Sequence, residues 1–435
     1  MLNQFIPTQE SLLPKGVKDF LPLKAVKIDY LNRTLAEVFQ HWGFRPVVTP
    51  SLENLDVLEN GLGAGLRERT FRFDDRQSGK LVAFPPDITP QIARIFATRM
   101  QDLPLPLRLC YSGRVLRHAE QQAGKDREIF QAGVELIGLE SAEADAEMIT
   151  MAIESLQAIG AREFTVDIGQ VEFFNGIMAE LDLPAAALQN LREAIVRKDN
   201  SELKSLLEAL PISDRSKEEL QILPRLFGGR EILDKAANTV RNARSQAALD
   251  NLDQVLDVLD VHDVANHLTL DLAEIRSLDY HTGITFQGFL PGLGRAVCSG
   301  GRYDNLTARY GRQAPATGFT FNLLNLLFAL DRELENQVEN RVDVLLFQAG
   351  ADKKPAQRIA RALRNKGYSA ARDMLPRDLE TSLAYAGKMK FTYLMIISEN
   401  DQPLRLIRVA DSQERTLTLA DIVADEFILN PAGDK

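Results

Sequence analysis

The sequence has few cysteines, few histidines and no long hydrophobic run, and each absence excludes a class of protein. Only Cys110 and Cys298 occur in 435 residues, and no CxxC pair is present, so we expect no disulfide framework. The five histidines are scattered, and His262 and His267 have neither helical i, i+4 spacing nor a nearby thiol, which argues against a metal site. The longest apolar stretch, residues 323–330, is too short to span a bilayer.

The chain also lacks the marks of a secreted or low-complexity protein. Residues 1–16 contain no basic segment followed by an apolar one, so we expect no secretory signal, no membrane association and a cytoplasmic location. The composition, 45% hydrophobic and 26% charged, is typical of a globular protein. A length of 435 residues exceeds one compact core and predicts two or three domains.

Positive charge is scarce as well. Asp and Glu total 61 against 51 Lys and Arg, a formal net charge of −10, whereas a protein that coats duplex nucleic acid is normally basic. The balance is uneven, because residues 341–435 hold 15 basic and 13 acidic residues, a net +2, and the preceding part therefore carries −12. The net charge of the whole chain does not by itself exclude a local basic surface.

The pattern of hydrophobic residues divides the chain into three parts. Residues 1–335 alternate helical and extended patterns, which predicts an α+β body. Within this body, residues 171–261 are rich in Leu, Ala and charged residues at helical spacing, and we interpret them as an all-helical insertion. Residues 322–334 are predicted to form one helix at the end of the body. After a polar linker, residues 342–435 predict a small α/β domain with a mixed sheet.

One candidate site lies in residues 107–138, which read as two antiparallel strands joined by a long polar loop. Arg117 ends the first strand, and Gln131 and Glu135 share one face of the second because side chains alternate along a strand. An Arg facing a Gln and a Glu could hold the charged groups of an amino acid. A hairpin with a solvated polar face is the other interpretation, since such faces are common on antiparallel sheets.

Two further stretches place polar and glycine residues in strand-like contexts. The first, residues 274–286, contains His281, which by itself is as typical of packing as of ligand binding. The second, residues 296–306, contains Gly300 and Gly301, which permit either a close backbone approach to a ligand or a tight bend. Neither stretch is a phosphate-binding G-x-x-x-x-G-K-[ST] or G-x-G-x-x-G motif.

Taken in order, these and other segments resemble the class II histidyl-tRNA synthetases from about residue 13 to the end of the chain. Residues 42–53 resemble class II motif 1, residues 110–135 motif 2 and residues 315–327 motif 3. The segments that carry the resemblance are PKGVKDFLP (14–22), WGFRPVVTPSLE (42–53), CYSGRVLRHAEQQAGKDREIFQAGVE (110–135), RSLDYHTG (276–283), SGGRYD (299–304) and PATGFTFNLLNLL (315–327).

The resemblance implies a fold and an assembly. The body is expected to have the class II architecture, an antiparallel sheet flanked by helices with a helical insertion, and the C-terminal domain is expected to resemble an anticodon-binding domain. Pro50 matches a position at the family's dimer interface, so the resemblance implies a homodimer formed through motif 1.

The resemblance also implies an amino-acid pocket that suits histidine. Asp87 and Thr89 match the loop that binds the α-amino group, and Arg117 and Gln131 match positions near the carboxylate and the amine. Glu135 matches a partner of the imidazole, while His281 replaces the second residue of a Tyr-Tyr pair. The complete implied histidine-binding set is Asp87, Thr89, Arg117, Gln131, Glu135, Arg276, Tyr280, His281 and Tyr303.

Residues that would serve ATP in a working synthetase are replaced. The motif 3 arginine, which holds the ATP phosphates in the family, is Asn325 here, and the acidic residue of motif 2 is Ala119. The family's Arg-Pro-Glu-Gly-Thr loop has Pro85 in place of its Arg and Ile88 in place of its Gly. Loss of a full charge at a phosphate costs several kcal/mol of transition-state stabilisation. We therefore expect no catalytic residues, no metal and no cofactor.

A synthetase body with an eroded adenylation site resembles a family of regulatory paralogues. Those proteins pair with a short-form ATP phosphoribosyltransferase catalytic subunit in the first step of histidine biosynthesis. The resemblance implies a hetero-oligomer with histidine as the allosteric effector, and tRNA as an unlikely partner. Two alternatives stay open at this point: a divergent but active histidyl-tRNA synthetase, and a synthetase-like RNA-binding or translational-control protein.

Overall fold

A computed structural model describes residues 13–118, 126–273, 280–335, 337–338, 342–350, 353–398, 403–424 and 426–429. The chain divides into two compact units, Met1–Gln337 and Val338–Lys435, which are described separately.

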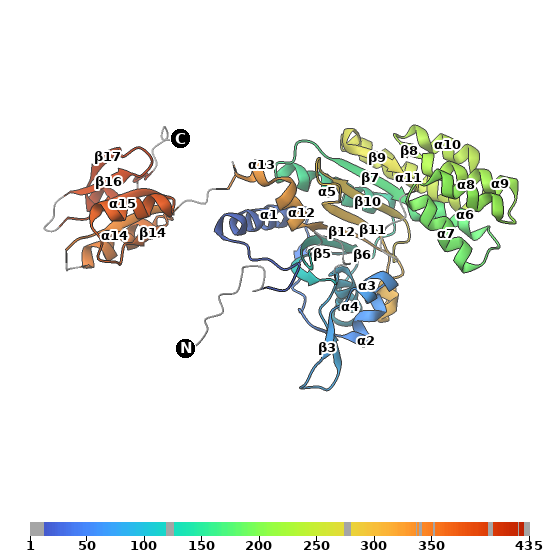
Figure 1. The fold of residues 1–435 in the computed structure, drawn as a ribbon, viewed down its shortest axis with the longest axis horizontal. Coiled ribbons are helices and arrows are strands. Elements are labelled where there is room, and N and C mark those ends of the chain that lie inside the picture. The colour runs from blue at the N-terminus through green and yellow to red at the C-terminus, as the bar shows by residue number, and fades with distance from the viewer. Residues whose placement is uncertain are drawn as a thin grey trace, which may run out of the picture. The chain divides into compact units, whose positions relative to one another are not determined.

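A nine-stranded sheet forms the centre of the first unit (Figure 1). Its neighbouring strands are antiparallel except for the pairs β1–β5 and β7–β9, which are parallel. Helices flank the sheet, and the predicted α+β class is confirmed. In spatial order the strands are β1 (Arg45–Pro46), β5 (Leu107–Leu116), β6 (Glu128–Ile137), β12 (Ala316–Asn322), β11 (Cys298–Arg302), β10 (Ile284–Phe289), β7 (Thr165–Gln170), β9 (Leu268–Asp271) and β8 (Phe227–Gly228).

The predicted hairpin is formed by β5 and β6, which pair antiparallel from Leu107↔Ile137 to Leu116↔Glu128. Strand β12 continues the sheet on the other side of β6, and Gly318 lies opposite Glu135. The alternation of side chains along β6 separates the two faces of the sheet. Apolar residues such as Val134 face the main core, while Gln131 and Glu135 face the opposite side.

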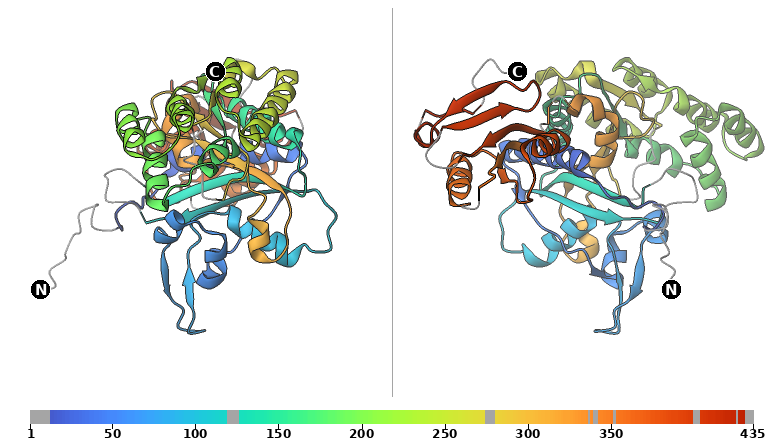
Figure 2. Two further views of the ribbon diagram at one scale, coloured as in Figure 1. Left: turned by 90° about the vertical axis from the view of Figure 1, so that its right-hand side faces the viewer. Right: turned by 60° about the vertical axis from the view of Figure 1, so that its left-hand side comes forward.

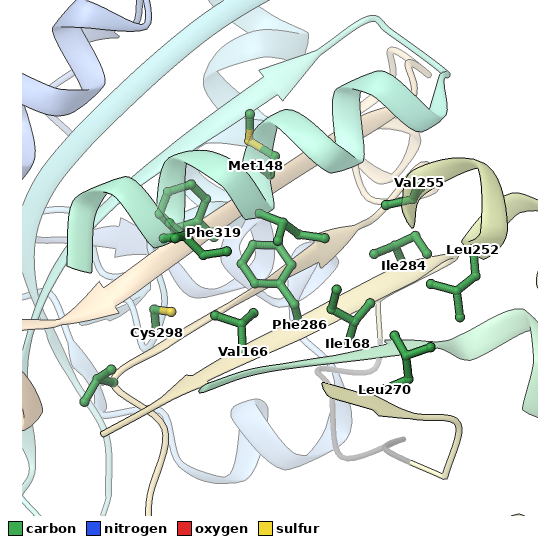
Figure 3. Close-up of a cluster of buried hydrophobic side chains, with 14 of the residues drawn as sticks. Met148, Val166, Ile168, Leu252, Val255, Leu270, Ile284, Phe286, Cys298 and Phe319 are labelled. Carbon is green, nitrogen blue, oxygen red and sulfur yellow. The ribbon is translucent and has the colours of Figure 1, made fainter. Parts of the chain in front are cut away.

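The main core lies between one face of the sheet and helices α1 (Pro22–His41), α5 (Ala142–Ala158) and α11 (Ala243–Val261). Helix α5 begins at Ser141, whose side chain caps Ala144 N–H, and it ends before Gly160, which has a φ of 89°. Figure 3 shows Met148 of α5 packed with side chains of the strands, Phe286 and Phe319 among them. Fully burying a side chain of this size stabilises the fold by roughly 1.5–3 kcal/mol.

The opposite face of the sheet is covered by α4 (Thr89–Arg99) and the 3-10 turn η5 (Thr307–Tyr310). A small sheet of β2 (Glu53–Asn54), β4 (Leu81–Ala83) and β3 (Arg72–Asp74) extends from this side (Figure 2). The buried carboxylate of Glu53 accepts hydrogen bonds from Arg94 at 2.6 and 2.8 Å and from Gln91 at 2.9 Å. This network joins the small sheet to α4. Short helical segments accompany it, namely α2 (Leu55–Leu58), η2 (Glu59–Gly61) and α3 (Ala64–Glu68).

Residues 171–261 are helical, as the hydrophobic pattern predicts, with one exception. Phe227 and Gly228 form the two-residue strand β8, which pairs with β9 and extends the central sheet. This strand is too short to produce a recognisable alternation of side chains. The other helices of the segment are α6 (Val171–Ala179), α7 (Ala185–Val196), α8 (Asn200–Ala209), α9 (Asp214–Ile222), η3 (Leu223–Arg225) and α10 (Glu231–Thr239), and η4 (Ala265–His267) follows it.

The single helix predicted over residues 322–334 is wrong. Two helices, α12 (Leu323–Ala329) and α13 (Asp331–Glu335), meet at Leu330, whose backbone leaves the helical region with ψ at 20°. Lys27, which is buried, donates from Nζ to the carbonyl of Asp331 at 2.6 Å and to its carboxylate at 2.7 Å. The local hydrophobic pattern of residues 322–334 could not predict this long-range contact.

The second unit has a five-stranded mixed sheet in the order β14-β13-β15-β16-β17. Strand β13 is parallel to β14 and β15, and the remaining pairs are antiparallel. Helices α14 and α16 cover one face of this sheet and α15 the other. The elements are β13 (Val342–Phe347), α14 (Lys354–Asn365), β14 (Ala370–Arg372), α15 (Leu379–Lys388), β15 (Phe391–Ile396), β16 (Leu404–Arg408), β17 (Glu414–Leu417) and α16 (Leu419–Val423). Among the helices that the structure describes, none has the length and apolar character needed to cross a membrane.

Candidate functional site

A cavity of about 270 Å³ opens on the polar face of the central sheet of the first unit. Strands β6, β10, β11 and β12 form its floor, and residues 85–89 before α4 contribute to its wall. Every residue of the implied histidine-binding set that the structure describes lines this cavity. These are Asp87, Thr89, Arg117, Gln131, Glu135, Tyr280, His281 and Tyr303. Arg276 lies outside the described residues.

Glu135 lines the cavity and is only 1% exposed. Its Oε1 accepts a hydrogen bond from Thr89 at 2.7 Å and its Oε2 one from Tyr303 at 2.5 Å. Tyr111 donates a longer bond of 3.4 Å to Oε1. Burial raises the pKa of Glu135 from 4.5 to about 8, because the hydrogen bonds only partly offset the loss of solvent and the nearby charge of Asp87. This side chain is therefore mostly a neutral carboxylic acid at pH 7.

The space that the Glu135 side chain occupies depends on two glycines. A Cβ at Gly318 would lie 1.9 Å from Glu135 Oε2 and 2.4 Å from the carbonyl of Val134. A Cβ at Gly133 would lie 2.7 Å from the Tyr111 hydroxyl. Any larger residue at either position would push the carboxylate or the tyrosine out of place. The glycines therefore keep this end of the cavity open for polar side chains.

A second buried carboxylate, Asp87, forms the other polar centre. Tyr280 donates to Oδ2 and the Gln131 amide donates to Oδ1, both at 3.0 Å. The Gln131 Oε1 in turn accepts the backbone N–H of Ile88 at 3.2 Å, which fixes the orientation of the amide. Burial and the charges of Asp87 and Glu135 raise the pKa of Tyr280 well above its usual value, so this hydroxyl stays a hydrogen-bond donor.

Among the residues that the structure describes, Arg117 is the only Lys or Arg side chain that lines the cavity. Its Nε donates to the carbonyl of Pro86 at 2.6 Å, and this bond ties the arginine to the loop that carries Asp87. No described carboxylate forms an ion pair with Arg117, so its charge is available to an anionic group of a ligand. The cavity thus combines two buried acidic side chains with one guanidinium.

The aromatic wall of the cavity is formed by Tyr280, His281 and Tyr303. The Tyr280 and Tyr303 rings meet edge to face at 5.9 Å, and the Tyr280 and His281 rings are tilted at 4.9 Å. Such a wall can pack against a planar ring of a ligand. His281, which the family resemblance assigns to the histidine-binding set, lines the cavity.

Sequence reasoning missed several polar residues of this site. Thr285, Gln287, Ser299, Thr320 and Asn322 also line the cavity, all uncharged. Thr285 is 3% exposed, and its hydroxyl has no hydrogen-bond partner among the described residues. The alternation of polar and apolar residues along β10 and β12 could have identified these positions.

Tyr111 was also missed, although it supports the site. It lies on β5 opposite Gly133 and contacts Glu135 and Thr89 from the same face of the sheet. Burial and the charge of Glu135 raise the pKa of Tyr111 well above its usual value. The strand alternation that places Gln131 and Glu135 on one face of β6 also predicts this face for Tyr111.

The residues that stand in place of the family's ATP-binding residues are uncharged, and those that the structure describes make structural contacts. Asn325 lines the cavity, and its amide donates to the carbonyl of Ala296 at 2.7 Å. Pro85 contributes its carbonyl to a hydrogen bond from Leu116 N–H at 3.3 Å, and Ile88 is buried in the apolar cluster under α4. Ala119 lies outside the described residues. In the described part of the chain, no three His, Cys, Asp or Glu residues form a metal-binding group.

Comparisons with known proteins identify relatives over nearly the whole chain. The histidyl-tRNA synthetase family model matches residues 16–326. The ATP phosphoribosyltransferase regulatory subunit of Syntrophotalea carbinolica is 61% identical, with 98% of this chain and 100% of that protein covered. The protein of the same name from Geobacter sulfurreducens is 54% identical over 98% of each chain.

Solved structures give the same picture of the fold. A Bacillus halodurans structure described as an ATP phosphoribosyltransferase regulatory subunit/histidyl-tRNA synthetase has a TM-score of 0.81 at 27% identity, over 90% of this chain and 99% of that one. A histidyl-tRNA synthetase from Nostoc has a TM-score of 0.79 at 22% identity, over 94% and 97% of the two chains, which shows a shared fold alone. The predicted class II architecture is confirmed.

Proposed function

The chain belongs to the family of ATP phosphoribosyltransferase regulatory subunits, which share the histidyl-tRNA synthetase fold, and from this membership and the geometry of the cavity we propose that it is a non-catalytic histidine sensor. Histidine binds in the cavity of the first unit and inhibits a partner catalytic subunit. In the absence of histidine, the chain activates that subunit.

The observation that carries this proposal is the placement of Glu135 and Asp87 in one buried cavity with Arg117. Histidine has a cationic amine, a basic ring and a carboxylate, and each group has a complementary partner here. The amine suits Asp87, which already receives the Gln131 and Tyr280 donors. The ring suits the carboxyl group of Glu135, and the carboxylate suits the guanidinium of Arg117. A neutral or purely anionic ligand would leave one of the acidic groups without a partner.

The absence of synthetase activity is proposed from the charges around the cavity. Adenylate formation needs cations near the phosphates as charge develops on them. Arg117 is the only arginine or lysine on the cavity in the described part of the chain, and the uncharged Asn325 takes the place of the motif 3 arginine. Of the described lining residues, a triphosphate would face the buried carboxylate of Asp87, with the single guanidinium of Arg117 to offset its charge.

Pyrophosphate exchange with histidine and ATP tests this part of the proposal. We expect exchange at the background rate of a heat-denatured control, also at high enzyme concentration. Robust exchange would overturn the non-catalytic assignment and favour a divergent histidyl-tRNA synthetase, a function with which the C-terminal unit is compatible.

The regulatory mechanism is proposed to be linkage between two binding events. Histidine shifts an assembly with a short-form catalytic subunit toward a less active state, and it does so only by binding that state more tightly. The coupling is reciprocal, so substrates of the catalytic subunit weaken histidine binding by the same factor. Calorimetric titration of histidine into the assembled complex, with and without those substrates, measures this factor. Equal affinities would exclude the proposed coupling.

A mixing assay tests the partner directly. We expect the chain to raise the activity of a short-form ATP phosphoribosyltransferase subunit, and added histidine to reverse this activation. If activation occurs and histidine has no effect, the cavity serves another ligand. If no activation occurs, the proposed partner is wrong, while histidine binding is still measurable on the isolated chain.

We also propose that the chain forms the homodimer that its resemblance to motif 1 implies. Near Pro50, Val48 is 91% exposed, and Leu52 and Leu81 are also exposed apolar side chains. Apolar surface of this kind is typical of an interface. Sedimentation equilibrium should show a dimer of the isolated chain, and Val48→Glu should shift it toward monomer. A wild-type monomer at all concentrations would contradict this part.

A further inference from the structure

A second hollow, of about 700 Å³, lies on the C-terminal unit between α14 and β14. Helix α14 contributes Arg361 and Arg364, strand β14 contributes Ala370 and Arg372, and Met374 closes one end. Figure 1 shows α14 and β14 next to each other in this unit. We refer to this hollow as the α14–β14 groove.

The α14–β14 groove is strongly positive. Of the lining residues that the structure describes, three are arginines and none is acidic. Among the described residues, no carboxylate forms an ion pair with Arg361, Arg364 or Arg372. By contrast, Arg405 in the same unit forms an ion pair with Glu414 on the neighbouring strand. The groove therefore presents unneutralised guanidinium groups to an anionic partner.

The groove also runs along an open strand edge, because β14 is the last strand of the five-stranded sheet. The Ser369 carbonyl accepts from Val344 N–H at 3.0 Å, and Asp373 N–H donates to the Leu346 carbonyl at 2.8 Å, so these residues face β13. Since backbone groups alternate in direction along a strand, those of Ala370 and Arg372 point to the open edge. They can pair with one more extended chain.

We propose that the α14–β14 groove binds an extended acidic segment of a partner protein. The segment adds as a strand along β14 and places its carboxylates against Arg361, Arg364 and Arg372. The exposed side chains of Met374 and Leu375, 80% and 58% exposed, offer apolar contacts at the end of the groove. A protein segment is favoured over single-stranded RNA, because none of the described lining residues is aromatic and RNA-binding grooves typically stack bases on aromatic rings. This proposal is independent of histidine binding.

Fluorescence anisotropy on the full chain tests the proposal. The probe is a labelled, capped peptide of alternating glutamate and valine, compared with its lysine–valine counterpart, with an N-methylated version and with a single-stranded RNA of similar length. We expect the acidic peptide to bind with an affinity that falls with salt. N-methylation of alternate peptide bonds should weaken it about tenfold or more, because it removes donors to the strand edge.

Charge reversal identifies the surface involved. The double variant R361E/R364E should weaken peptide binding at least about tenfold, and so should Arg372→Glu measured separately. The matched control is Arg358→Glu, an exposed arginine of the same helix that does not line the groove, and it should change the affinity less than about threefold. Equal loss in R358E, no effect of N-methylation, or tighter binding of the RNA with displacement of the peptide would each overturn the proposal.

Discussion

Gly318 and Glu135 lie opposite each other on β12 and β6, and a Cβ on residue 318 would be 1.9 Å from Oε2 of Glu135. The glycine therefore determines where the carboxyl group of the candidate site can lie. Oε2 accepts the 2.5 Å bond from Tyr303, so the same missing methyl also keeps Tyr303 in position.

Gly318→Ala should destabilise the first unit and weaken histidine binding. Overpacking of a buried position typically costs about 1–3 kcal/mol, and here the methyl also meets the Val134 carbonyl. We expect a fall of several degrees in the melting temperature, measured by calorimetry. Histidine affinity should drop about tenfold or more as the Glu135 carboxyl group moves.

A double-mutant cycle with Glu135→Ala serves as the control for this prediction. Removing the carboxyl group relieves the contact at Oε2 but not the contact at the Val134 carbonyl, so Gly318→Ala should cost less in that background by about 1 kcal/mol. Gly65→Ala, at a position with open space around it, should have no comparable cost. Strict additivity of the two substitutions would show that Gly318 does not act through Glu135.

The buried carboxyl group should also make folding stability depend on pH. The pKa of Glu135 is about 8 in the folded chain against 4.5 ordinarily, so between these values the folded state binds more protons than the unfolded state. Stability therefore falls as pH rises from 4.5 to 8, by at most about 1.4 kcal/mol per unit from this residue, and is unaffected by it outside this range. Relative to Glu135→Gln, the wild-type melting temperature should decline across this range. A constant difference between the two proteins would contradict the raised pKa.

Much of the fold could be predicted from local patterns, because they are strong where one face of an element is buried. The β5–β6 hairpin and the helical character of residues 171–261 follow from periods of two and of 3.6 residues. The break between α12 and α13 could not be predicted, since it involves Lys27, about 300 positions earlier in the chain. The open edge of β14 depends likewise on strand order, which local patterns do not contain.

The candidate site was predictable only in part. The alternation of side chains along β6 placed Gln131 and Glu135 on one face of the strand. That Asp87 and Tyr280 lie beside them depends on how α4 and the residues near β10 pack against the sheet. The family resemblance implied that these four residues belong to one pocket, whereas their spacing in the sequence did not. The resemblance gave residue types and left out supporting groups such as Tyr111 and Gly318, whose roles appear only in the contacts they make.

Histidine binding should depend on pH in a way that identifies Glu135. In the free state the ring of histidine titrates near pH 6.5 and Glu135 near pH 8. If the bound pair holds one proton, affinity is greatest between these values and falls on either side. The affinity ratio of wild type to Glu135→Gln, which cancels titration of the ligand's amine, should decline toward tenfold per unit above pH 8. Calorimetric titration from pH 6 to 9.5 measures this ratio, and a flat ratio would place the ring elsewhere.

Arg117→Gln should abolish histidine inhibition of the assembled complex while leaving assembly and activation intact. The charge-assisted hydrogen bonds that an arginine makes to a carboxylate contribute roughly 1.5–3 kcal/mol, so histidine affinity should fall about 10–150-fold. Arg117→Lys should lose part of this affinity, because a lysine keeps the charge without the planar fork that now also reaches the Pro86 carbonyl. The matched control is Arg114→Gln on β5, an exposed arginine that lies three residues earlier and pairs with Glu128, and it should leave inhibition unchanged. If histidine inhibits the Arg117→Gln and Glu135→Gln complexes as it does wild type, the effector binds outside this cavity.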